Sequence, residues 1–217
     1  EKYGLAVSVD PKLVKAYQAR AEVNELLGNK AAVAQDRKRI AALVPEEAAF
    51  GAAAAMAYLE LDSAAQALQL AEDALKRDDK NMQALQAKVR AALKLGDLDR
   101  ATAASDAAVA LKGTTDTYYL RGLVRTATRD YQTAEADFDR VIEWNHLYEP
   151  AYVAQAEVQL ALYERYTGPT MQMRTLEKAI DKCRLALELN PQSTDALFWR
   201  SKAYAAQKEY AKAIDDI

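Results

Sequence analysis

Turn-forming residues recur through the first half of the chain at a constant interval. Pro11, Pro45, Asp79 and Gly113 are each separated by 34 residues. All three residue types favour leaving a helix, because proline lacks the amide hydrogen, aspartate bonds its own backbone and glycine tolerates a positive φ. An interval kept over four turns predicts an array of repeated units, each packing only on its neighbours.

The segments between these turns have the composition of helices. Of the 217 residues only 7 are glycine and 5 are proline, and 51% are hydrophobic. Val, Ile and aromatic residues do not alternate with period two, as a half-buried strand requires. We therefore predict an all-α protein, organised as one array rather than as separate compact domains.

The last third of the chain, residues 176–217, carries the most detailed pattern. Small residues stand where one helix would press on another, for example Ala186, Ser201 and Ala213. Pro191 separates the helix of Ala186 from the helix of Ser201. This stretch is expected to be half of one helical hairpin and most of the next.

This pattern resembles the tetratricopeptide repeat family, which has large residues at positions four and eleven, a small one at eight, alanine at twenty and twenty-seven, and proline near thirty-two. Leu197, Ser201, Tyr204 and Ala213 fill positions four, eight, eleven and twenty of one repeat. The second helix of the preceding repeat fits through Ala179, Cys183, Ala186 and Pro191. The resemblance implies a right-handed superhelical solenoid of antiparallel helix pairs.

In this register the chain is a single array over residues 1–217. Residues 1–13 are expected to end a preceding repeat, and the last residue falls inside a second helix, so we expect an excerpt of a longer array. The repeats occupy residues 14–47, 48–81, 82–114, 115–148, 149–193 and, incompletely, 194–217. Departures from the family pattern include Arg20, Asn24, Val33 and Arg37 in the first repeat and Gly51 at position four of the second.

The fifth repeat carries about eleven residues more than the others, with an insertion near residues 163–175. A Gly-Pro pair lies inside it, so we predict that the first helix runs through Tyr166 and that the second begins near Thr170 as cap. The hairpin would then protrude. Tyr163 and Tyr166 become candidate partner-binding residues, because exposed apolar side chains often mark interfaces. Alternatively, the extension folds against its neighbour.

Charge and hydropathy argue against two classes of partner. The chain has 29 basic and 32 acidic residues, interleaved, with a formal net charge of −3. A surface that follows phosphates should be basic, so we expect no nucleic acid partner. No run of about 18 apolar residues is present, so no membrane insertion is expected. A single cysteine, Cys183, excludes an intrachain disulfide and leaves the redox compartment undecided.

The sequence offers no candidate catalytic, cofactor-binding or metal-binding residues. His146 is the only histidine and occupies a turn position. Cys183 occupies a packing position, which favours a buried, inert thiol over a nucleophile. The two Asp-Asp pairs are best explained as solvated charge, and no glycine-rich phosphate loop is present. We therefore predict no enzymatic activity, no cofactor and no metal.

The resemblance also implies where a partner would bind. In tetratricopeptide proteins the first helices line a concave groove, into which positions two, five, nine, twelve and thirteen of each repeat face. That face is apolar in its middle here, which suits an extended peptide or a partner helix. The candidates are Met56, Leu59, Arg90, Tyr119, Leu123, Val153, Leu160 and Phe198. Alternatively, several of these side chains pack against adjacent first helices.

We therefore predict a non-enzymatic scaffold or adaptor that binds another protein. An alternative is a regulatory or substrate-recruiting arm of a larger multidomain enzyme whose catalytic domain lies outside this chain. Self-association through the uncapped ends is a further option. The domains of this family that clamp a C-terminal carboxylate use lysine, asparagine and arginine where this chain has Gln18, Glu22, Ala53, Gln83 and Ala87, so that specificity is not expected.

Overall fold

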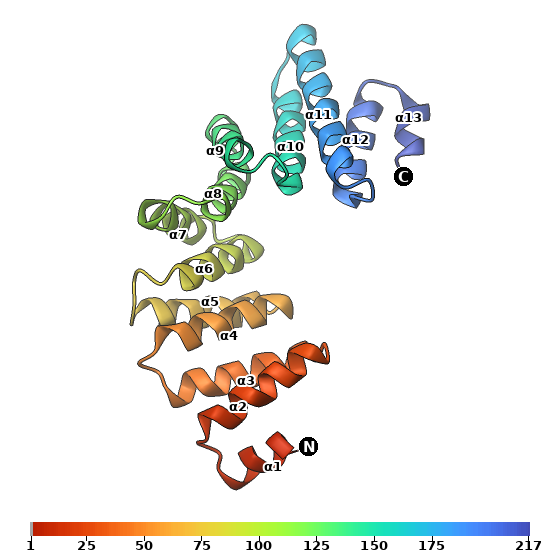
Figure 1. Cartoon of the computed structure of the whole chain (residues 1–217). Coiled ribbons are helices and arrows are strands. Elements are labelled where there is room, and N and C mark those ends of the chain that lie inside the picture. Colours follow the sequence, from red (N-terminus) through yellow and green to blue (C-terminus); the bar gives the residue numbers. More distant parts are fainter. Residues whose placement is uncertain (1) are drawn as a thin grey trace. The chain divides into compact units, whose positions relative to one another are not determined.

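The computed structural model describes residues 2–217, which form helices joined by short turns, without a strand in that range (Figure 1). The helices are α1 (Lys2–Val9), α2 (Val14–Leu26), α3 (Lys30–Leu43), α4 (Ala48–Glu60), α5 (Ala64–Leu75), α6 (Met82–Leu95), α7 (Leu98–Leu111), α8 (Thr115–Ala127), α9 (Tyr131–Trp144), α10 (Glu149–Arg165), α11 (Pro169–Leu189), α12 (Thr194–Ala206) and α13 (Tyr210–Asp215). The predicted all-α class is confirmed. Within residues 2–217 no helix has both the length and the apolar character needed to cross a bilayer.

The chain forms two compact units, one ending at Lys112 and the other running from Gly113 to Ile217. In the first unit α2 pairs with α3, α4 with α5 and α6 with α7, and successive pairs pack through α3–α4 and α5–α6. In the second unit the pairs are α8–α9, α10–α11 and α12–α13, and α10 also contacts α8 and α12. Each unit is thus a stack of helix pairs, as the repeat pattern predicts.

Except between α10 and α11, the turn within each helix pair contains one residue with a positive φ, at position fifteen of the repeat. Glycine adopts this conformation without strain, whereas residues with a Cβ do so at a cost. The residues are Gly28, Asp62, Gly96, Arg129 and Lys208, with φ of 72°, 56°, 71°, 64° and 64°. Because three of the five are not glycine, the packing of the two helices, rather than local preference, imposes this turn.

The turn between helix pairs is covered by the side chain at position four of the next repeat. The hydroxyl of Tyr17 donates to the carbonyl of Pro11 at 3.4 Å, and that of Tyr152 to the carbonyl of His146 at 3.1 Å. In each case the partner carbonyl lies six residues earlier. An aromatic ring at position four therefore joins one repeat to the end of the preceding one.

Small residues at position eight make room for larger ones from the second helix. A Cβ built on Gly122 would lie 2.4 Å from the ring of Phe138, which is fully buried. Ala134, on the same side of α9, is also fully buried and belongs to the same apolar cluster. The small residue lets the two helices approach closely, and the ring of Phe138 fills the space between them. This packing stabilises the pair.

The fifth repeat contains the longest helix pair, with 17 residues in α10 and 21 in α11. The first helix ends at Arg165, one residue before the predicted Tyr166. The second begins at Pro169 with Gly168 as N-cap, so the prediction of Thr170 as cap is wrong. The reason is that proline suits the first helical position, where its missing amide hydrogen and fixed φ cost nothing.

Candidate functional site

In the second unit, equivalent positions of three successive first helices carry three residues predicted to bind a partner, Tyr119, Leu123 and Phe198, and two charged residues beside them in the repeat pattern. Tyr119 and Leu123 lie on α8, Glu157 on α10, and Phe198 and Lys202 on α12. They occupy position five or nine of their repeats, so the residues on α8 and on α12 form pairs one turn apart on one side of their helix, and Glu157 stands at position nine of α10. We call these five residues the α8–α10–α12 face.

The α8 end of this face is aromatic. The ring of Tyr119 lies 6.0 Å from that of Phe138 and 5.2 Å from that of Tyr148, in an edge-on arrangement with the latter. Leu123 is half-buried and packs against the same cluster as Tyr119. Edge-on and tilted ring pairs are favourable beyond the area they bury, so Tyr119 is held in a defined orientation.

The α12 end combines an exposed ring with a cation. Phe198 is 50% exposed and packs edge-on against Trp199, with ring centroids 5.1 Å apart. The ammonium of Lys202 lies 4.6 Å from the centre of the Phe198 ring and 4.9 Å from that of Trp199. This cation is thus positioned by two rings while remaining accessible.

Between these ends, Glu157 introduces a partly buried carboxylate. Burial raises the pKa of Glu157, nearby Lys202 partly offsets this by favouring the charged form, and Asp195 adds to the increase. A buried carboxylate without a strong partner is energetically unfavourable. Glu157 is therefore the one group of the α8–α10–α12 face that the fold tolerates at a cost.

Two further candidates from α10, Val153 and Leu160, are buried, with 9% and 8% exposure. Val153 packs in a cluster with Tyr152 and Ala196. Leu160 packs with residues of α11 and α12, and Tyr163 is half-buried against this same cluster. These three side chains support the core of the second unit in the structure as it stands.

The remaining candidates lie elsewhere. Tyr166 is half-buried at the end of α10, where its carbonyl accepts a hydrogen bond from the side-chain amide of Gln172 at 2.7 Å. In the first unit, Met56 and Leu59 are half-buried against an alanine cluster, and Arg90 is exposed on α6. Tyr119, Leu123 and Phe198 are thus only partly buried or exposed at equivalent positions of α8 and α12, whereas the other candidates lie in the core or at separate positions.

No arrangement for catalysis is evident in the described residues. Within residues 2–217 no three His, Cys, Asp or Glu side chains gather so that they could hold a metal ion. Burial raises the pKa of Cys183 to about 12, so its thiol is not activated. His146 is exposed in a turn, and its backbone carbonyl, rather than its ring, makes the contact with Tyr152.

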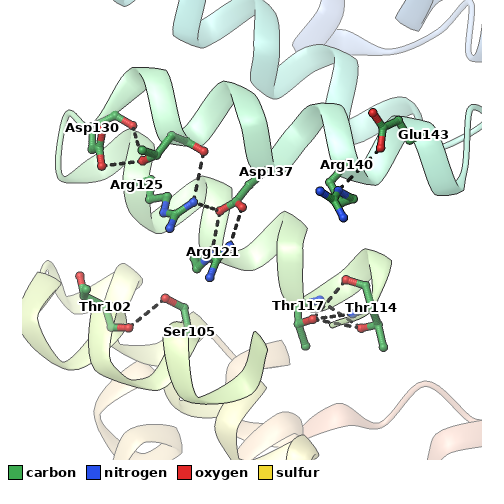
Figure 2. A network of polar contacts seen from close by, with 11 residues as sticks. Thr102, Ser105, Thr114, Thr117, Arg121, Arg125, Asp130, Asp137, Arg140 and Glu143 are labelled. Atoms are coloured by element: carbon green, nitrogen blue, oxygen red, sulfur yellow. Dashed lines mark hydrogen bonds and ion pairs between the residues drawn. The ribbon is translucent and has the colours of Figure 1, made fainter. Parts of the chain in front are cut away.

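A polar network that sequence reasoning missed lies inside the α8–α9 pair (Figure 2). The carboxylate of Asp137 accepts two hydrogen bonds from Arg121 and a third, at 2.7 Å, from Arg125. Asp137 is buried to 3% exposure, so its charge is neutralised inside the helix pair. The spacing of sixteen residues between Arg121 and Asp137, which recurs in two other repeats, is the signal that could have revealed it.

Position seven also links neighbouring repeats where the arginine is absent. The ammonium of Lys88 lies 3.3 Å from Glu72 of the preceding repeat. The side-chain amide of Gln155 donates to Asp139, again in the preceding repeat, at 2.7 Å. A side chain at position seven therefore either bonds to the second helix of its own repeat, as the arginines do, or bonds to the second helix of the preceding repeat, as Lys88 and Gln155 do.

The fold defines a helical-repeat protein built from stacked pairs of helices. Residues 115–145, which span α8 and α9, match the sequence model of the tetratricopeptide repeat. The chain therefore contains a tetratricopeptide repeat in α8 and α9, and over these residues the resemblance drawn from the sequence is confirmed.

Solved structures agree on the fold. A tetratricopeptide repeat protein from Parabacteroides merdae is 17% identical, with 94% of this chain and 77% of that one covered and a TM-score of 0.72. The type IV pilus biogenesis factor PilW is 13% identical over 94% of this chain and 90% of its own, with a TM-score of 0.77. YrrB, a tetratricopeptide repeat protein with an unusual peptide-binding site, is 17% identical over 84% and 89%, with a TM-score of 0.58. A search of curated protein sequences found no match.

Proposed function

We propose that this chain is a protein-interaction scaffold whose α8–α10–α12 face holds a peptide or a helix of a partner protein, and that the chain itself has no catalytic role. Tetratricopeptide repeat proteins generally serve as non-catalytic scaffolds. The unusual peptide-binding site of YrrB belongs to that protein, and it supports the view that a chain of this fold can hold a peptide.

One observation carries the proposal. Phe198 is half exposed, although it is a large apolar side chain, and Lys202 holds its ammonium over the ring. Exposed aromatic side chains flanked by polar groups are enriched at interfaces, where a central ring supplies most of the binding energy. Lys202 beside the ring favours a partner segment that combines an apolar side chain with a carboxylate.

The test is capture of partners from native extract with wild-type protein and with a Tyr119→Ala, Phe198→Ala double variant. We expect the double variant to lose the captured protein, because truncation of central aromatic residues typically costs about 2 kcal/mol or more each. The matched control is Leu147→Ala, which removes an apolar side chain that is 63% exposed in the turn after α9. Equal capture by wild type and double variant, with unchanged helical circular dichroism, would refute the proposed face.

A further inference from the structure

The second repeat lacks the side chain that covers the preceding turn. Position four is Gly51 there, whereas the other repeats carry Tyr17, Leu85, Tyr118, Tyr152 and Leu197. Beside Gly51 lies a cavity of about 430 Å³, formed by α3, α4 and α5. Its lining residues are Lys38, Ala41, Ala42, Pro45, Glu47, Ala48, Gly51, Leu70, Asp73, Ala74, Lys76 and Arg77.

This cavity is the counterpart of the space that a tyrosine ring fills in other repeats. Around Tyr152, Lys182 lies over the ring at 6.0 Å and Ala186 shares its apolar cluster. Counted from the turn that closes each repeat, these residues correspond to Leu70 and Ala74 of the second repeat. Both line the cavity.

The neighbours of Tyr118 give the same correspondence. Its ring is packed edge-on by Trp144 at 5.3 Å, and the guanidinium of Arg140 lies 5.8 Å from its centre. These two positions correspond to Arg77 and Asp73, which also line the cavity. The positions that surround a tyrosine ring in other repeats therefore also line the cavity in the second repeat, although their side chains differ.

The hydrogen-bond acceptor of such a site is present as well. Tyr17 and Tyr152 each donate to the carbonyl six residues earlier, at Pro11 and His146. The equivalent residue for Gly51 is Pro45, which lines the cavity. Among residues 2–217 no backbone amide donates to the carbonyl of Pro45. A ring in the cavity could thus donate its hydroxyl there.

The chain cannot readily fill the space itself. A Cβ built on Gly51 would lie 3.1 Å from the Cβ of Ala74 and 3.5 Å from the carbonyl oxygen of Leu70. Because α4 and α5 approach so closely at this point, any side chain at position 51 would press on a buried helix contact. A free ring without a covalent bond to α4 can shift to avoid this contact.

We propose that this cavity binds a small phenol in the place of the missing tyrosine, with its ring between Ala41, Leu70 and Ala74 and its hydroxyl donating to the carbonyl of Pro45. The alanine walls supply an apolar surface, and the acceptor supplies the specificity for a hydroxyl. Because Gly51 and Ala74 close the inner end, a short substituent opposite the hydroxyl fits best. The site lies in the first unit and does not depend on the α8–α10–α12 face.

The direct test is a titration of isotope-labelled protein with p-cresol, followed by amide chemical shifts. We expect saturable shifts confined to α3, α4, α5 and the turn at Pro45, with a dissociation constant of about 1 mM for a ligand of this size. The methyl ether, 4-methylanisole, has the same ring but no donor. It should bind roughly two- to tenfold more weakly, because one hydrogen bond is lost.

A blocking variant separates the cavity from general surface binding. Ala42 is exposed on the α3 wall, so Ala42→Trp should fill the cavity without disturbing the core and should abolish the shifts. Ala65→Trp introduces the same side chain at an exposed position of α5 outside the cavity and should bind p-cresol as wild type does. Shifts that persist in Ala42→Trp, or equal affinity for p-cresol and its ether, would overturn the proposal.

A phenol could come from a free small molecule or from a tyrosine side chain of another protein. N-acetyl-tyrosinamide, which imitates the tyrosine side chain with its backbone, distinguishes these two sources. Its backbone atoms would occupy the end of the ring that Gly51 and Ala74 enclose, and this overpacking should weaken its binding about tenfold or more relative to p-cresol. Equal or tighter binding would instead identify a tyrosine side chain of a protein as the occupant and overturn the assignment to a small molecule. The absence of saturable shifts with both ligands would overturn the site altogether.

Discussion

Arg121 binds Asp137 through two hydrogen bonds, from Nε at 2.9 Å and from Nη2 at 2.7 Å. The arginine stands at position seven of the first helix, and the aspartate at position twenty-three of the same repeat. The same paired geometry recurs between Arg20 and Asp36 and between Arg200 and Asp216. Each aspartate side chain is at most 5% exposed. In these three repeats a buried ion pair therefore joins the first helix to the second.

Asp137→Ala should strongly destabilise the second unit. The substitution leaves the guanidinium groups of Arg121 and Arg125, with side chains 17% and 27% exposed, without their shared acceptor. Removing one partner of a buried ion pair leaves an uncompensated charge and costs about 3–5 kcal/mol. Urea unfolding followed by circular dichroism should show a lower transition midpoint.

The matched control is Glu143→Ala in the same helix. Glu143 pairs with Arg140 at 3.6 Å, but both side chains are more than half exposed. Surface pairs of this kind contribute about 0–1 kcal/mol. Similar losses for the two variants would show that burial of the Asp137 carboxylate contributes nothing special to stability.

Gly122→Ala should also destabilise the protein, although alanine is normally more favourable than glycine inside a helix. A Cβ at this position would lie 2.4 Å and 2.7 Å from two ring carbons of Phe138, which cannot move because it is fully buried. Overpacking of this kind typically costs about 1–3 kcal/mol. Thermal unfolding should reveal a lower melting temperature.

Gly4→Ala provides the comparison, because Gly4 lies in α1 and, apart from its chain neighbours and the nearby backbone of its own helix, nothing lies within 4 Å of the Cβ it would gain. There the helix propensity of alanine should leave stability unchanged or raise it by up to about 1 kcal/mol. A second variant, Gly122→Ala with Phe138→Leu, should recover part of the loss by freeing space. If Gly122→Ala alone were neutral, the close packing of α8 on α9 would be wrong.

The succession of paired helices could be predicted because it rests on backbone requirements and on size. A turn needs a residue that leaves the helix, and a close helix contact needs a small side chain, so both leave a trace in a single sequence. Arg20 shows the limit of this reasoning. Arg20 departs from the family pattern, yet its bond to Asp36 satisfies both groups inside the pair. A pairing of two polar residues cannot be inferred from positions that are judged by apolarity alone.

The candidate site was less predictable for a different physical reason. Position five is occupied by Val153 on α10 and by Phe198 on α12, yet the first is buried and the second half exposed. The difference depends on what packs beside each helix, since α10 contacts α8, α9, α11 and α12. Neighbours along the stack decide exposure, and the sequence of a single repeat does not contain them.

Glu157→Gln should stabilise the protein at neutral pH. Burial raises the pKa of Glu157, so the folded state binds the proton more tightly than the unfolded state does. The wild-type protein therefore loses stability as pH rises through the folded pKa, and a neutral glutamine avoids this loss. The advantage of the variant should shrink as pH falls below the ordinary carboxyl range, which unfolding at a series of pH values would measure.

Glu164→Gln is the control for this pH dependence, because Glu164 is an exposed carboxylate of the same helix. The free energy of unfolding of the Glu164→Gln variant should follow that of the wild type at every pH. If Glu157→Gln also followed the wild type, burial would not control the ionisation of Glu157. A destabilised Glu157→Gln at neutral pH would instead make the attraction of Lys202 the dominant effect.

Cys183 should be unreactive in the folded protein and reactive in the unfolded chain. Its side chain is fully buried in α11, and burial raises its pKa to about 12. Since the thiolate is the reactive form, both access and ionisation oppose its modification by a disulfide reagent. At neutral pH we expect labelling at least about a thousandfold slower than in guanidinium chloride, at a rate that follows the opening of α11.

The control is an exposed cysteine on another helix. In a Cys183→Ala background, a cysteine introduced by Ala136→Cys on the exposed side of α9 should react at once. Rapid labelling of wild-type Cys183 under native conditions would mean that α11 opens readily and that the fifth repeat is not firmly packed.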